Sequence, residues 1–204
     1  MANAQRPISL LAAIGLTACA TTLEPLPKML GPQAAGVGIS IGIHSVLRNQ
    51  EPDAAYFVRV DDRDNVFGLY TLRSNYAKGH NAYLLNAKPG LYAVVAASYT
   101  QSLPGLSINR VAYLPEELIR KTIVEVKPGT LSYMGTFEVD MAAMAGFRSA
   151  DRAQEYYRAK VGTGPVNTFQ SMEKKSMREP ASEEKFYQKA REDFSESEWS
   201  RILR

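Results

Sequence analysis

A possible catalytic serine lies in residues 38–42, whose order Gly-Ile-Ser-Ile-Gly matches the nucleophile pattern G-x-S-x-G. Asp64 and His80 follow Ser40 in an order that a hydrolytic triad can take, with the histidine as general base. Such a nucleophile needs a strand, a sharp turn and then a helix, whereas here both intervening residues are isoleucines within an unbroken apolar alternation. We therefore interpret Ser40 as a strand residue, predict no catalytic site, and keep a serine hydrolase as the least favoured alternative.

Metal binding is the second chemistry that clustered side chains could support. Asp61, Asp62, Asp64 and Asn65 supply clustered carboxylate and amide oxygens, which suit Ca²⁺. Their spacing lacks the glycine and the closing glutamate of a calcium loop, so a solvated turn is favoured. The two histidines, His44 and His80, are too few for a histidine-based zinc site without carboxylates. We predict no metal site and no cofactor.

The single cysteine, Cys19, excludes an intrachain disulfide, a C-x-x-C redox pair and a multi-thiolate zinc site. It follows one cationic side chain, Arg6, and an apolar run over residues 8–16 that is too short to span a bilayer. This layout is typical of a secretory signal peptide. The alternative is a short buried helix that carries an inert thiol.

The residues Leu16-Thr17-Ala18-Cys19 resemble the lipobox of bacterial lipoproteins, in which the thiol is acylated and the preceding peptide bond is cut. The resemblance implies that residues 1–18 are a signal peptide and that Cys19 carries a diacylglyceryl group as the first residue of the mature chain. More than one acyl chain anchors a protein stably. Ala20, rather than aspartate, after the cysteine implies an outer-membrane location facing the periplasm.

Three prolines, Pro25, Pro27 and Pro32, fall within the almost uncharged segment that follows the cysteine. Pro-rich chain extends at about 3.1 Å per residue, which gives this segment a reach of about 50 Å. We predict that residues 19–35 are a lipidated N-terminus and a tether that holds the folded domain clear of the membrane.

The sequence between residues 36 and 140 predicts a series of short strands separated by turns. Apolar and small residues alternate over residues 37–44, and Lys-Pro-Gly turns at 88–90 and 127–129 each lead into an aromatic strand. The pattern predicts a mainly β fold, an antiparallel β-sandwich of about seven to eight strands over residues 36–140. It resembles the Ig-like or transthyretin-like sandwiches of bacterial lipoproteins, a resemblance that brings no catalytic residues. The expected strands cover 37–44, 56–60, 66–72, 82–85, 91–99, 107–114, 122–126 and 131–139.

Residues 141–204 are charged and poor in β-branched side chains, and they predict a helical C-terminal extension. Asp151 is positioned to cap one helix, and Ser195 and Glu198 match a capping box. The apolar residues here could pack on the sandwich, which we favour, or could bind a partner or a membrane interface. They are Phe186, Tyr187, Ala190, Phe194, Trp199, Ile202 and Leu203.

The composition of the 204-residue chain narrows its function. With 45% hydrophobic residues it is not disordered, and a net charge of +3 gives no basic excess suited to nucleic acid. Eight of the eleven tyrosines fall within residues 56–133, where they could form a glycan-binding face, although packing is favoured. We predict a lipid-anchored, non-catalytic cell-envelope protein that binds or scaffolds an envelope or cell-wall partner. The alternative is a glycan- or peptidoglycan-binding module.

Overall fold

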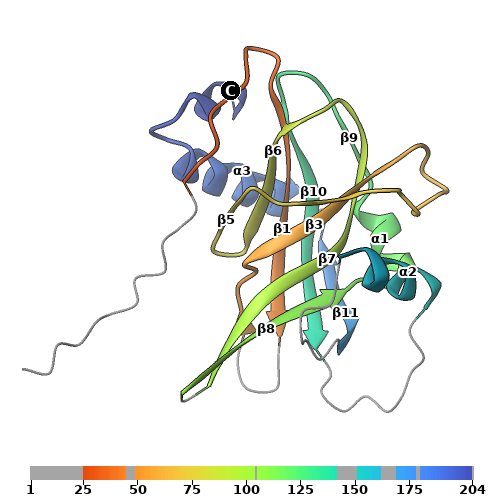
Figure 1. The fold of residues 1–204 in the computed structure, drawn as a ribbon. Helices are drawn as coiled ribbons and strands as arrows, with labels where there is room; N and C mark the ends of the chain where they lie inside the picture. Colours follow the sequence, from red (N-terminus) through yellow and green to blue (C-terminus); the bar gives the residue numbers. More distant parts are fainter. Residues whose placement is uncertain are drawn as a thin grey trace, which may run out of the picture.

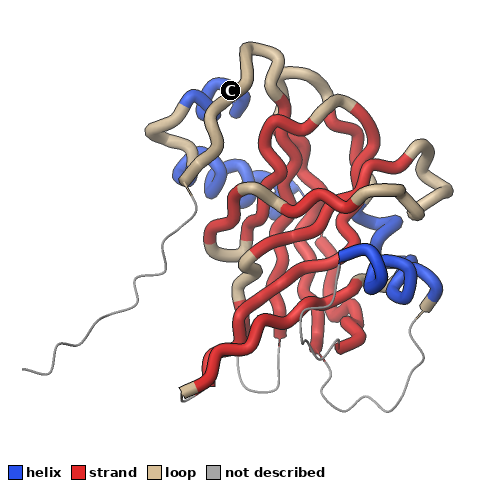
Figure 2. Tube along the Cα trace, in the orientation of Figure 1, coloured by secondary structure: helices blue, strands red, loops and turns tan. Residues whose placement is uncertain are grey.

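The computed structural model describes residues 25–44, 49–103, 105–141, 151–161, 169–177 and 180–203. These residues form a mainly β structure with helices at its periphery (Figures 1 and 2). The described strands are β1 (Ala35–His44), β2 (Asn49–Gln50), β3 (Ala54–Val60), β4 (Thr71–Arg73), β5 (Tyr76–Lys78), β6 (Asn81–Ala87), β7 (Gly90–Leu103), β8 (Leu106–Tyr113), β9 (Val124–Val126), β10 (Leu131–Met141) and β11 (Phe169–Met177). The described helices are α1 (Glu116–Thr122), α2 (Arg152–Val161), α3 (Pro180–Asp193) and the 3₁₀ helix η1 (Glu198–Leu203).

Two sheets enclose the core, which confirms the predicted sandwich with a helical C-terminal segment. One sheet has β6, β1 and β10 at its centre, and the other has β3, β7 and β8. Strand β11 joins them, because it pairs antiparallel with β10 and parallel with β8. Strands β1 and β10 also pair in parallel, an arrangement open to them because a long crossover connects them. The described part of the chain holds three strands that the sequence did not predict, namely β2, β5 and β11.

The alternation in β1 works as predicted. Ile39 and Ile41 are buried between the sheets, in the same core as Phe57 of the facing sheet. Gly38 and Ser40 face the opposite side, because successive side chains of a strand point to opposite faces of the sheet.

The apolar side chains of β10 change from one face of the sheet to the other within the strand. Leu131 belongs to an apolar cluster on the outer face of the β6–β1–β10 sheet, which we call the outer cluster, and Tyr133 packs against this cluster. Met134 and Phe137 belong instead to the core between the sheets. The cause is a bulge: the pairing of β10 with β1 shifts register there, and Gly135 has a φ of +122°. The bulge therefore allows Tyr133 and Thr136 to face the same side.

Strand β11 corrects the prediction that residues 141–204 are helical. Its sequence, Phe-Gln-Ser-Met-Glu-Lys-Lys-Ser-Met, has no clear apolar alternation. It is a strand because its backbone pairs with β10 on one side and with β8 on the other. The sandwich therefore extends into the predicted C-terminal extension.

Helix α3 and η1 cover the outer face of the β6–β1–β10 sheet. Phe186, Phe194 and Trp199 are buried there against residues such as Tyr83 of β6. Packing on the sandwich, the favoured alternative for these side chains, is confirmed. The predicted capping box is wrong, because Ser195 Oγ donates a hydrogen bond to the Glu192 carbonyl oxygen, 3.1 Å away, and Glu198 begins η1.

The segment from residue 25 to residue 34 is packed against the domain. Trp199 Nε1 donates a 2.6 Å hydrogen bond to the Pro27 carbonyl oxygen, and Leu26 and Met29 pack against the outer cluster. Figure 1 shows this red segment beside the C-terminal helices. The predicted free tether over residues 19–35 is therefore wrong for this part, since apolar contacts hold it to the fold.

Helix α2 begins where the sequence predicts. Gln154 N donates a 2.8 Å hydrogen bond to Asp151 Oδ1, so Asp151 caps the helix. Asp151 Oδ2 also accepts a 2.7 Å hydrogen bond from Glu116 N at the start of α1. One carboxylate thus joins the two helices.

Candidate functional site

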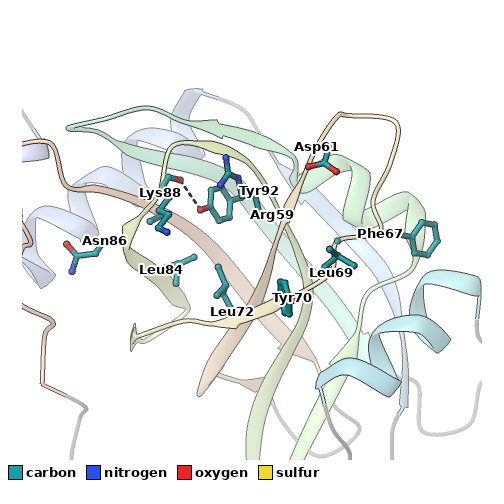
Figure 3. Close-up of a pocket in the computed structure, with 12 residues that line it drawn as sticks. Arg59, Asp61, Phe67, Leu69, Tyr70, Leu72, Leu84, Asn86, Lys88 and Tyr92 are labelled. Carbon is teal, nitrogen blue, oxygen red and sulfur yellow. Dashed lines mark hydrogen bonds between the residues drawn. The ribbon is translucent and has the colours of Figure 1, made fainter.

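A pocket of about 720 Å³ opens where β6 turns into β7, and residues of both sheets line it (Figure 3). We call it the β6–β7 pocket. Its walls are largely apolar and its polar groups lie to one side, an arrangement typical of small-molecule sites of roughly 300–1,000 Å³. The apolar lining residues are Phe67, Leu69, Tyr70, Leu72, Leu84, Ala87 and Tyr92, and the polar ones are Arg59, Asp61, Asn86 and Lys88.

One wall of the pocket is a loop, residues 66–70, that α2 holds in place. Tyr157 Oη accepts a 3.0 Å hydrogen bond from Gly68 N and donates one to the Val66 carbonyl oxygen. Tyr156 Oη donates to the Gly68 carbonyl oxygen at 3.0 Å, and Lys160 Nζ donates to the Leu69 carbonyl oxygen at 2.9 Å. These side chains satisfy backbone groups that a strand would pair with a neighbouring strand.

These hydrogen bonds from α2 explain why the strand predicted over residues 66–72 is wrong for most of its length. The loop becomes a strand only at Thr71, the first residue of β4. Gly68 lies so close to β3 that a Cβ there would overlap the Val58 side chain and lie 2.5 Å from the Arg59 carbonyl oxygen. A glycine is therefore required for the loop to pack at this place.

The polar side of the pocket is built around the β6–β7 turn. Tyr92 Oη donates a 2.8 Å hydrogen bond to the Lys88 carbonyl oxygen, and Arg59 packs against Gly90, whose φ is +147°. Burial raises the pKa of Tyr92, while the positive charge of Arg59 opposes that rise. The charged lining residues are two cations, Arg59 and Lys88, and one carboxylate, Asp61. This side of the pocket therefore carries a net positive charge.

The rim of the pocket exposes large apolar side chains. Leu69 is 72% exposed, Tyr70 79% and Leu72 40%, and Figure 3 shows the three along one side of the opening. Asn86 opposite them donates a hydrogen bond to the Lys28 carbonyl oxygen and accepts one from Leu30 N, so the docked N-terminal segment borders the pocket. Adjacent exposed apolar groups at a concave site typically mark a binding surface.

The three residues of the possible triad do not come together. Ser40 and His80 both line a second pocket of about 600 Å³ beside α3, which we call the α3 pocket, and no hydrogen bond joins them in the described structure. Asp64 lies instead in the loop after β3, where its carbonyl oxygen accepts a 2.8 Å hydrogen bond from Arg120. Ser40 lies within β1 with strands paired on both sides, so its interpretation as a strand residue is confirmed.

The acidic residues after β3 form a turn. Asp62 Oδ1 accepts hydrogen bonds from Asp64 N at 2.8 Å and Asn65 N at 2.7 Å, so this carboxylate satisfies local backbone donors. Asp61 lines the β6–β7 pocket. Among the described residues, no group of three or more His, Cys, Asp or Glu side chains is placed to hold a metal ion.

The remaining predicted residues are dispersed. His44 Nε2, at the end of β1, lies 3.7 Å from Glu138 Oε2, and His80 lies in the turn between β5 and β6. Cys19 lies outside the described residues. Of the tyrosines within residues 56–133, Tyr76, Tyr83, Tyr92, Tyr99 and Tyr113 are buried, which confirms the packing interpretation for them, while Tyr70 is exposed at the pocket rim.

We expect the buried tyrosines to make the stability of the fold sensitive to alkaline pH. Burial raises the pKa of Tyr157 from 10 to about 12, and burial also raises the pKa of Tyr83 and Tyr92. A phenol whose pKa is higher in the folded state stabilises the fold fully below the unfolded value, and this contribution is lost as the pH rises through the folded value. We expect the urea midpoint to fall between pH 10 and about 12, and to fall less steeply in Tyr157→Phe. A midpoint that stays constant to pH 12 would contradict this.

The pocket residues carry no signal that sequence reasoning could have used. Leu69, Tyr70 and Leu72 fit a strand, and their exposure results from the hydrogen bonds with which α2 holds the loop over residues 66–70.

In the described part of the chain, no helix combines the length and apolar composition needed to cross a bilayer. Comparisons of the chain with models of known protein families, with curated proteins and with solved structures find no match.

Proposed function

We propose that this chain is a lipid-anchored, non-catalytic binding protein of the cell envelope and that the β6–β7 pocket is its ligand site. The observation that carries the binding role is the continuity of an apolar pocket with the exposed Leu69, Tyr70 and Leu72 at its rim. Such groups stay in water unless a ligand covers them, and covering them is favourable at about 25 cal/mol per Å² of apolar area.

The lining favours a small amphiphile with an apolar body and an anionic head. The volume of about 720 Å³ suits a small molecule rather than a folded partner. Leu84 and Tyr92 would contact the apolar body, while Arg59 and Lys88 would attract the anionic head.

The lipid anchor rests on Cys19 and the residues before it, which resemble a lipobox. Ala20 to Glu24 are the residues between the modified cysteine and the docked segment. Because an extended chain spans at most about 3.3–3.6 Å per residue, the anchor would hold this side of the domain within about 20 Å of the bilayer surface. The membrane itself would then be a nearby source of amphiphilic ligands.

Ligand binding is tested with the full chain as Cys19→Ser and a dansyl-labelled fatty acid. We expect Leu69→Ser combined with Tyr70→Ser to weaken binding at least about tenfold, because two apolar contacts are lost. Both side chains are exposed, so the melting temperature should not change. Leu106→Ser is the matched control, since Leu106 is 54% exposed in β8 and does not line the pocket.

Equal binding in the double variant and the wild type would overturn the assignment of the pocket. Binding of muropeptides in place of the fatty acid, lost in Tyr70→Ser, would favour the glycan-binding alternative. The anchor is tested separately by metabolic labelling with an alkyne fatty acid: the wild-type chain should be labelled and fractionate with membranes. An unlabelled wild-type chain in the cytosol would overturn the envelope assignment.

A further inference from the structure

The α3 pocket is separate from the proposed ligand site and has a different chemistry. It lies between α3 and the β5–β6 turn, on the outer side of the β6–β1–β10 sheet. Lysines from two elements line it, Lys78 from β5 and Lys185 and Lys189 from α3. Among the described residues that line it, Glu51 is the one carboxylate, so cations outnumber anions at its wall.

The floor of the α3 pocket is a polar row beside the apolar cluster on the outer sheet face. Asn81, Ser40 and Thr136 pair across β6, β1 and β10, so their side chains form one row of amide and hydroxyl groups. Next to this row, Tyr83 and Phe186 pack with ring centroids 5.7 Å apart. A polar row at the edge of this apolar cluster offers hydrogen bonds to a polar ligand.

One of the lysines is held in place by a buried network. Lys78 Nζ lies 3.2 Å from Asp193 Oδ1, and the Asp193 side chain is fully buried. Tyr83 Oη donates a 3.1 Å hydrogen bond to Asp193 Oδ2, and Asn81 Nδ2 donates a 2.9 Å hydrogen bond to Tyr83 Oη. The same network therefore orients the lysine at the wall and the amide at the floor.

The two lysines of α3 are available to a ligand. Lys185 has no hydrogen bond or ion pair among the described residues. Lys189 Nζ lies 2.7 Å from Glu192 Oε2, but both side chains are about half exposed, and an exposed pair of this kind contributes little free energy. An anionic ligand could take the place of Glu192 at a low cost.

We propose that the α3 pocket binds the phosphate group of a small molecule. A phosphate presents several anionic oxygens, which match ammonium groups around the wall and hydroxyl and amide donors on the floor. Lysines act on a phosphate as compact point charges that approach from different directions. The pocket has a volume of about 600 Å³, which leaves room for the organic part of the ligand.

The test is isothermal titration calorimetry of the full chain with inorganic phosphate and with glycerol 3-phosphate, at low ionic strength. We expect glycerol 3-phosphate to bind and Lys185→Gln combined with Lys189→Gln to weaken it at least about tenfold. Lys127→Gln is the control, because this exposed lysine lines neither pocket. A melting temperature equal to that of the wild type confirms that the double variant is folded.

The other results of the titration overturn the proposal. Absence of binding, equal binding in the double variant, or an equal loss in Lys127→Gln would exclude a site at α3. Acetate that binds as well as glycerol 3-phosphate would exclude selectivity for phosphate. Binding of the labelled fatty acid should not change in the double variant, so this site and the proposed function can fail independently.

Discussion

Trp199→Ala should lower the melting temperature by about 10 °C, since loss of a buried tryptophan costs about 3–5 kcal/mol and each kcal/mol is worth about 2–4 °C in a domain of this size. Trp199 is 1% exposed, packs in the outer cluster, and donates the hydrogen bond that holds the N-terminal segment at Pro27. The substitution therefore leaves a cavity and also leaves a carbonyl oxygen without its partner. Differential scanning calorimetry measures the effect.

The control for this variant is Glu196→Ala, an exposed change three residues away in the chain, which should not shift the melting temperature measurably. Truncation after Glu179 removes α3 and η1 and should destabilise the protein more than Trp199→Ala, because it exposes Tyr83 and its apolar neighbours on the sheet. If both variants melt like the wild type, the C-terminal helices do not stabilise the sandwich.

Gly68→Ala should both destabilise the protein and weaken ligand binding at the β6–β7 pocket. The new methyl group would overlap Val58 and press on the carbonyl oxygen of Arg59. Strand β3 cannot move away, because it is paired with β4 and β7, so the loop over residues 66–70 must shift. Overpacking of this kind costs about 1–3 kcal/mol, and we expect a melting temperature about 5 °C lower.

The loop shift should appear as a loss of fatty-acid binding of about tenfold or more, larger than the loss of stability alone would produce. Gly42→Ala is the matched control: a Cβ there would have its nearest neighbour 3.7 Å away, which is ordinary contact. This control should bind like the wild type. If Gly68→Ala binds equally well, the loop does not shape the ligand site.

The strand pattern predicted most of the sandwich because burial of one face leaves its mark on local sequence. The isoleucines of β1 lie between the sheets, and Asp151 caps α2 as its position before the helix predicts. Prediction failed where backbone partners come from distant parts of the chain. Strand β11 is held by β10 and β8, and residues 66–70 are held by Tyr156, Tyr157 and Lys160 of α2.

The candidate sites were predictable only in part. Ser40 and His80 do line one pocket, but they do so as part of a polar row and a lysine-lined wall rather than as a triad. Nothing in the spacing of Lys78, Lys185 and Lys189 indicates that they meet, because Lys78 lies about a hundred residues before the other two. The β6–β7 pocket likewise depends on α2, far along the chain, to hold its wall.

Local sequence accounts for much of the sandwich, because apolar and small residues alternate along its strands, and the lipobox-like residues around Cys19 are also read directly from the sequence. Tertiary contacts, in contrast, set the phase change at Gly135, the docking of residues 25–34 at Trp199, and the placement of both pockets. The difference lies in how far apart in the chain the interacting residues are. Hydrophobic periodicity indicates which face of a helix or strand is buried, and it can be read from neighbouring residues. The pockets, and the hydrogen bonds that hold the loop over residues 66–70, form between side chains and backbone groups that come together only when the chain folds.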